Sequence, residues 1–123
     1  MGAEDNAWTW LDETVYTTVV PAAHVPRLLE IEADRFQNLK LSPDDVNKEA
    51  GAVYGEFRKS QADPGSKLGE QLWATAFQTH TYGHDTIGYE ADIAAMPDAY
   101  DYAMTFFDRF YRPANANLVV VGR

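Results

Sequence analysis

The sequence Ser42-Pro43-Asp44-Asp45 constrains the fold more than any other segment, because it fixes the start of a long helix. Serine is favoured at the N-cap, proline suits the first helical position, and acidic residues complement the positive end of the helix dipole. Apolar residues then recur at helical spacing as far as the Ala-Asp-Pro-Gly sequence at 62–65. They are Val46, Ala50, Val53, Tyr54 and Phe57. We therefore predict an amphipathic helix that begins at Pro43 and ends at this break.

The segments on either side of this helix predict an α+β fold. Residues 14–20 are dense in β-branched and aromatic side chains, which predicts a strand, and residues 6–10 are a weaker strand candidate. The apolar run at 118–122 predicts a short buried strand. Further helices are predicted over about 25–39, 66–77 and 97–111. This order favours an antiparallel sheet of about three strands that is packed on one face by about four helices.

Composition excludes two classes of partner. The 123 residues carry 10 Lys plus Arg against 19 Asp plus Glu, a formal charge of -9, whereas nucleic acids and anionic membranes attract basic patches. The chain has no cysteine, so a bound metal would need His, Asp or Glu. It has no apolar run of membrane-spanning length and no signal-peptide pattern at its start. We expect a soluble single domain whose compartment the sequence does not specify.

Two glutamates on the predicted long helix could carry chemistry. Glu49 and Glu56 are seven residues apart and project in nearly the same direction. At about 100° per residue they lie about 80–100° from the centre of the apolar stripe, so they flank the buried face. One interpretation is a pair of boundary glutamates in surface salt bridges, which is the commoner case because glutamate is abundant in helices. The other is two stacked carboxylates, one a metal ligand and the other its support.

The three histidines are weaker candidates. His80 and His84 have the spacing with which two imidazoles share a zinc ion on one helix face. Gly83 and the absence of helical periodicity argue against a helix there, so this spacing does not predict a metal site. His24 precedes a predicted helix and is interpreted as a capping or packing residue.

Four segments, in the order found in the family, resemble the pitrilysin/insulinase peptidases. The first is Asn-Ala-Trp-Thr at 6–9 followed by Asp-Glu-Thr-Val-Tyr at 12–16, and the second is Glu49 with Glu56. The third is His-Thr-Tyr-Gly at 80–83, where Thr81 replaces the family's usual proline. The fourth covers 110–122 and is similar to the family's tyrosine, proline, asparagine and apolar strand. Each segment alone is weak, and the ordered set carries the resemblance.

The resemblance implies a partial metallohydrolase domain of the processing-peptidase type, a zinc-dependent endopeptidase. In the family, zinc is bound by two histidines of an inverted H-x-x-E-H helix and by the second glutamate of a Glu-x6-Glu pair, which corresponds to Glu56. Glu49 corresponds to the first glutamate, a supporting carboxylate. Asn6 and Ala7 correspond to the edge strand on which a peptide or small-protein substrate is laid. In the intact site zinc would lower the pKa of its bound water and the motif glutamate would take the proton.

The H-x-x-E-H motif is absent from the 123 residues. In the family it precedes the zinc-binding glutamate by about 76 residues, which would place it about 20 residues before Met1. We therefore expect residues 1–123 to be a single partial peptidase domain, the C-terminal part of a catalytic half, with Met1 internal or the start of a shortened chain. The isolated chain is expected neither to bind zinc tightly nor to cleave peptides.

The resemblance and the missing segment also imply partners. The family's peptidases enclose substrate between two halves of the same fold, so a second half-domain is expected. Loss of the upstream segment would expose a sheet edge and an apolar face, which favours self-association of the chain.

Two other interpretations stay open. The chain could be a non-catalytic half or structural subunit of the same fold. It could also be an acidic α+β module that recruits a partner through an exposed strand edge. Glu56→Ala would separate the classes, because it should abolish zinc binding and activity in the full-length peptidase and leave partner binding by a module intact.

Overall fold

The computed structural model describes residues 2–123. Within them, two strands pair in one antiparallel sheet, and five α-helices follow. The strands are β1 (Glu4–Thr9) and β2 (Thr14–Val19); the helices are α1 (Val25–Asn38), α2 (Pro43–Ala62), α3 (Pro64–Ala76), α4 (Glu90–Ala95) and α5 (Tyr100–Phe110). Short 3-10 turns join several of them, among them η2 (Thr81–Gly83) and η3 (Met96–Asp98). No helix of the described residues is both long and apolar enough to cross a bilayer.

The chain divides into two compact units, each held by its own contacts. The hairpin unit contains residues up to 8 together with 14–41 and 101–123, and so includes β1 as far as Trp8, β2, α1 and α5 from Asp101. The helical unit contains 9–13 and 42–100, and so includes α2, α3 and α4.

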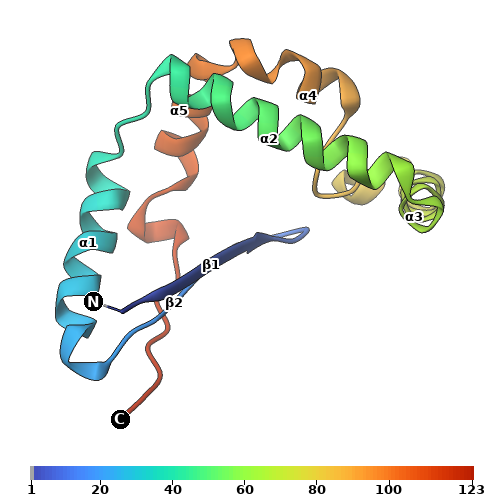
Figure 1. Cartoon of the computed structure of the whole chain (residues 1–123). Helices are drawn as coiled ribbons and strands as arrows, with labels where there is room; N and C mark the ends of the chain where they lie inside the picture. The colour runs from blue at the N-terminus through green and yellow to red at the C-terminus, as the bar shows by residue number, and fades with distance from the viewer. Residues whose placement is uncertain (1) are drawn as a thin grey trace. The chain divides into compact units, whose positions relative to one another are not determined.

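In the hairpin unit, β1 and β2 are six residues each and pair as neighbours (Figure 1). The Thr17 hydroxyl donates a hydrogen bond to the Asn6 carbonyl at 3.3 Å. At the turn the Trp10 N–H donates to the Glu13 carbonyl at 2.8 Å, and this bond together with the equal strand lengths places Asn6 opposite Thr17 and Ala7 opposite Tyr16. Elsewhere in the unit, aromatic rings gather around Tyr111, which follows α5, and Phe107 stacks on it with ring centroids 5.2 Å apart.

The helical unit is organised by α2, which begins where the sequence predicts. The Ser42 hydroxyl accepts the backbone N–H of Asp45 at 3.2 Å, and the Asp45 carboxylate accepts the Ser42 N–H at 2.9 Å, a reciprocal capping box. The hydrogen bonds from Ser42 hold the pKa of Asp45 below its ordinary value. The prediction of a helix from Pro43 is confirmed.

The buried core of the described residues lies in the helical unit. α2 packs against η3 and α4, and Figure 1 shows α4 lying along α2. Ala50 and Phe57 of α2 and Ile93 of α4 are buried, with 2%, 7% and 4% of their surface exposed. The two α2 residues are seven apart, as expected for one helix face.

Three features differ from the sequence prediction. α3 begins at Pro64, because Asp63 serves as its N-cap and accepts the Ser66 N–H at 2.7 Å. The short helix α4 was not predicted, and it raises the α-helices from about four to five. The predicted strand at 118–122 is wrong: these residues form no strand in the described sheet, and Leu118–Val121 are 60–91% exposed.

The missing third strand has a physical cause. An apolar, β-branched sequence sets only the propensity of a strand, whereas a strand forms when a neighbouring edge supplies its hydrogen bonds. The described sheet consists of β1 and β2 and does not include 118–122. The predicted covering of one sheet face by the helices stays a prediction.

Candidate functional site

Glu49 and Glu56 lie on α2 as the sequence predicts, exposed beside the packed stripe. Each immediately precedes a buried residue, Ala50 and Phe57 respectively. With 3.6 residues per turn, the two glutamates lie about 20° apart around the helix axis. The carboxylates therefore share one flank of α2, stacked two helical turns apart.

The ion pairs of the described residues bear on the first interpretation of this pair. Among residues 2–123, the ion pairs are Arg27 with Glu30 and Arg35 with Glu32, both on α1. Neither Glu49 nor Glu56 takes part in an ion pair within the described chain. The surface salt bridges of the first interpretation are therefore not formed within residues 2–123, and the metal-ligand interpretation stays a prediction.

One carboxylate is not a metal site by itself. Among the described residues, no three His, Cys, Asp or Glu side chains come together to hold a metal ion. Catalytic zinc takes three protein ligands and keeps a fourth position for water or substrate. Glu56 can supply one oxygen ligand. The described residues do not bring three ligands together, so the other ligands would have to come from elsewhere.

Asn6 and Ala7 lie in β1, and the register points their backbone groups in opposite directions. Because Trp10 bonds to Glu13 through its backbone, every second residue back along β1, and so Asn6, faces β2 with its backbone groups; the Asn6 carbonyl also accepts the Thr17 hydroxyl. Residues along an antiparallel strand alternate in the direction of their backbone groups, so the N–H and C=O of Ala7 face away from β2. No other strand of the described residues pairs there. Ala7, rather than Asn6, presents its main chain to the outer edge.

The Asn6 side chain covers part of that outer edge. Its Oδ1 accepts the backbone N–H of Ala7 at 2.9 Å. An incoming peptide carbonyl would need this same N–H, so it would have to displace the Asn6 amide. A polar side chain held over an open strand edge also discourages unspecific pairing with other strands.

The His-Thr-Tyr-Gly segment forms a tight turn whose contacts are structural. Nδ1 of His80 accepts the Tyr82 N–H at 3.2 Å, which caps η2. The Tyr82 ring packs edge-on against Phe77, with centroids 5.7 Å apart. Its hydroxyl donates to the carboxylate of Asp12 at 2.5 Å, and this hydrogen bond raises the pKa of Tyr82. Two of the segments that carry the family resemblance are thus joined by one hydrogen bond.

His84 and His24 belong to no cluster of three metal-ligand side chains among the described residues. His84 follows η2 in extended conformation, and its Nδ1 lies 2.6 Å from the Asp85 carbonyl. His80 and His84 are therefore not on one helix face, in agreement with the loop predicted there. His24 occupies the N-cap position of α1, but its side chain makes no capping hydrogen bond.

Gly83 is required by space rather than by chemistry. A Cβ at this position would lie 2.5 Å from the carbonyl oxygen of Phe77, a distance that real Cβ atoms do not show. The clashing atom belongs to the backbone, so it cannot move aside as a side chain would. This explains why glycine ends the segment, a reason that sequence spacing does not reveal.

Gly83→Ala is therefore expected to lower the free energy of unfolding by about 1–3 kcal/mol, the usual effect of overpacking. Gly55→Ala is the matched control, because Gly55 lies within α2 and a Cβ there meets nothing within 4 Å. That substitution should stabilise the chain by roughly 0.5–1 kcal/mol, since alanine favours helix. Urea unfolding of both variants measures the effects, and equal shifts in the same direction would contradict the steric explanation.

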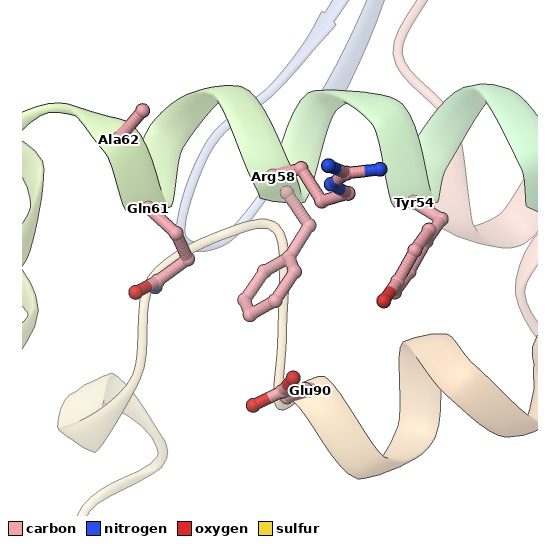
Figure 2. Close-up of a pocket in the computed structure, with 6 residues that line it drawn as sticks. Tyr54, Arg58, Gln61, Ala62 and Glu90 are labelled. Carbon is pink, nitrogen blue, oxygen red and sulfur yellow. The ribbon is translucent and has the colours of Figure 1, made fainter.

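A separate open hollow lies beside α2. It has a volume of about 410 Å³ and is lined by Tyr54, Phe57, Arg58, Gln61, Ala62 and Glu90. Figure 2 shows Tyr54 and Gln61 projecting from α2 toward the side on which Glu90 lies. By helix geometry, Tyr54 and Gln61 lie about 140–160° around the axis from Glu56. The hollow is therefore distinct from the flank that carries the two candidate glutamates.

Comparison with known proteins decides the family. Residues 1–90 match the family model described as Insulinase (Peptidase family M16). The chain belongs to this family. The first three of the four resembling segments lie inside the matched residues, and the resemblance found in the sequence is confirmed.

Individual relatives agree with this M16 assignment. The beta subunit of the mitochondrial-processing peptidase of Homo sapiens is 30% identical over 109 residues, which cover 87% of this chain and 22% of that protein. A protein of Rickettsia felis described as an uncharacterized zinc protease is 24% identical over 122 residues, 99% of this chain and 29% of the relative. A zinc protease of Mycobacterium tuberculosis, likewise described as uncharacterized, is 28% identical over 122 residues, 99% of this chain and 27% of the relative.

The M16 chain thus spans between 22% and 29% of the length of these curated relatives. No solved structure matches it.

Proposed function

We propose that residues 1–123 form part of the catalytic half of a zinc-dependent metalloendopeptidase, with Glu56 as the third zinc ligand. The observation that carries the proposal is the state of Glu56 in an M16 chain. Its carboxylate is exposed and free of ion pairs in the described residues, on a capped helix whose next residue, Phe57, is buried. A ligand on such a helix is held by packing and needs little reorganisation to bind.

The other site residues support this one. Glu49 lies two helical turns before Glu56 on the same flank of α2. It would orient the surroundings of Glu56 by hydrogen bonding, as supporting carboxylates do in metal sites. The outward backbone of Ala7 would pair with an extended peptide, and the Asn6 amide would release the Ala7 N–H as the peptide arrives. Main-chain pairing of this kind tolerates many substrate sequences.

Zinc, when bound, would polarise the scissile carbonyl and supply an activated water. Glu56 would contribute negative charge and geometry, and it would not act as the base. The general base and the two histidine ligands would come from an H-x-x-E-H helix outside these residues. Residues 1–123 are in this proposal a partial peptidase domain, inactive in isolation.

Partners follow from the same proposal. The human relative is named a beta subunit, which indicates a partner subunit for that protein. For this chain we propose a second half-domain of the same fold, which closes over a peptide or small-protein substrate. The exposed apolar side chains Leu68 and Leu72 of α3 and the exposed 118–121 segment support the presence of further contacts, including self-association of the isolated chain.

Zinc stoichiometry tests the proposal. The 123-residue chain alone is expected to retain less than one zinc per chain at micromolar concentration, because a single carboxylate cannot hold the ion. The same chain joined to a preceding H-x-x-E-H segment should retain one zinc and hydrolyse peptides. Mass spectrometry of the metal content measures this. A stoichiometric zinc on the chain alone would contradict the ligand assignment, and a full protein without zinc would favour the non-catalytic half.

A further inference from the structure

Two tyrosines from distant parts of the hairpin unit meet through their hydroxyl groups. Tyr16 lies in β2 and Tyr111 follows α5, yet their Oη atoms are 2.6 Å apart. The rings meet edge to face, with centroids 6.3 Å apart. The contact ties the second strand of the hairpin to the end of α5 within one compact unit.

Neighbouring side chains fix both rings. The Arg35 guanidinium lies over the Tyr16 ring at 4.7 Å from its centroid and pairs with Glu32. Phe36 of α1 and Phe107 of α5 lie against Tyr111, with centroids 5.8 and 5.2 Å away. Partial burial of the ring, with the hydrogen bond to Tyr111 second, raises the pKa of Tyr16 to about 12. At neutral pH the Tyr16 phenol is therefore protonated, and the two hydroxyls share one hydrogen bond.

One member of the pair, Tyr16, lies opposite Ala7, the strand residue proposed to bind substrate. Tyr16 is the cross-strand neighbour of Ala7, and cross-strand neighbours share one face of the sheet. The next residue of β2, Thr17, donates to the carbonyl of Asn6. A shift of β2 along its own axis would therefore carry Ala7 with it.

We propose that the Tyr16–Tyr111 hydroxyl pair is a positioning contact that holds β2, and through it the outward backbone of Ala7, at the place where peptide substrate adds. The proposal rests on the proposed peptidase function. Tyr16 and Tyr111 are positioning residues and touch no reacting atom. Their hydroxyls matter because a hydrogen bond fixes the distance and angle between two atoms more narrowly than ring packing does.

The Tyr16–Tyr111 contact is suited to fixing the position of β2 rather than to adding stability to the hairpin unit. Tyr16 retains 43% of its surface exposed, so it is not a core residue whose burial stabilises the unit. Phenylalanine at either position would keep the ring contacts and lose only the oxygen. The two hydroxyls share one hydrogen bond, so removing either one removes the whole contact.

Tyr16→Phe, Tyr111→Phe and the double variant test the proposal in the full protein. Each single variant should raise KM for an extended peptide by about 2- to 10-fold, the effect of one net hydrogen bond, with kcat nearly unchanged. The double variant should be no worse than either single one, because the partners act as a pair. Tyr102→Phe is the control: Tyr102 lies on α5, is 70% exposed, and its ring contact with Phe106 survives the change.

A second readout does not depend on catalysis. Hydrogen exchange of the β1 amides should be faster in Tyr111→Phe than in Tyr102→Phe, and ultraviolet titration should show the pKa of Tyr16 falling in Tyr111→Phe while staying above its ordinary value. Exchange and KM equal to those of the control would overturn the positioning role, as would additive single effects. If the wild-type protein cleaves no peptide, the proposed peptidase function fails, and the exchange arm alone decides whether the pair positions β1.

Discussion

Glu56→Gln in the full protein is expected to lose bound zinc and peptidase activity together. The amide keeps the size of the carboxylate but removes its negative charge, and an uncharged oxygen is a poor zinc ligand. Glu56 is exposed and makes no ion pair within residues 2–123, so the substitution should leave the fold intact. The loss of kcat/KM should exceed the roughly 10–100-fold that follows removal of a supporting residue.

Glu49→Gln provides the graded comparison. As the supporting carboxylate it should reduce zinc affinity or activity by roughly 10–100-fold, less than Glu56→Gln. Glu30→Gln is the matched control on another helix, because its pair with Arg27 is solvent-exposed and such pairs contribute little. Metal content, kcat/KM and circular dichroism of the three variants decide the roles. A larger effect from Glu49→Gln would exchange the two assignments, and full zinc in Glu56→Gln would end the ligand hypothesis.

Local chemistry made much of the fold predictable. The capping residues at 42–45 fix the start of α2, because an N-cap acts through bonds between residues three apart. The apolar period fixes which face of α2 is buried, and Ala50 and Phe57 lie on it. The same period placed Glu49 and Glu56 at the flank of this face. The order of resembling segments then identified the family, which no single segment could do.

Contacts between residues far apart in the chain could not be predicted from the sequence. A strand at 118–122 needs a partner edge, and a propensity cannot show whether one is present. The bond between Tyr82 and Asp12 joins residues 70 positions apart, and no local pattern marks it. The clash that reserves position 83 for glycine likewise depends on where the Phe77 carbonyl turns. The direction of the Ala7 backbone became clear only from the register with β2.

The register of β1 with β2 predicts a second large loss of activity, in the variant Ala7→Pro. Proline has no N–H, and its ring would occupy the outer edge of β1. Because the Ala7 N–H faces away from β2, its loss should spare the ladder between the two strands, as for proline on an edge strand. The preceding Asn6 is already extended in β1, which suits a residue before proline. We expect kcat/KM for extended peptides to fall by at least about 10-fold, from one lost main-chain bond and blocked access.

Two further variants distinguish the loss of a substrate hydrogen bond in Ala7→Pro from general destabilisation of the hairpin. Ala7→Gly keeps the N–H and should lose much less activity, with only the roughly 0.5–1 kcal/mol of stability that glycine removes from a strand. Asn6→Pro should destabilise the hairpin, because it places the missing donor on the side facing Thr17. Peptide hydrolysis and urea unfolding measure the set. Equal activity losses in Ala7→Gly and Ala7→Pro would show that substrate does not use this N–H. Unfolding of Ala7→Pro as severe as that of Asn6→Pro would show that the Ala7 N–H pairs with β2, which would move the substrate edge to Asn6.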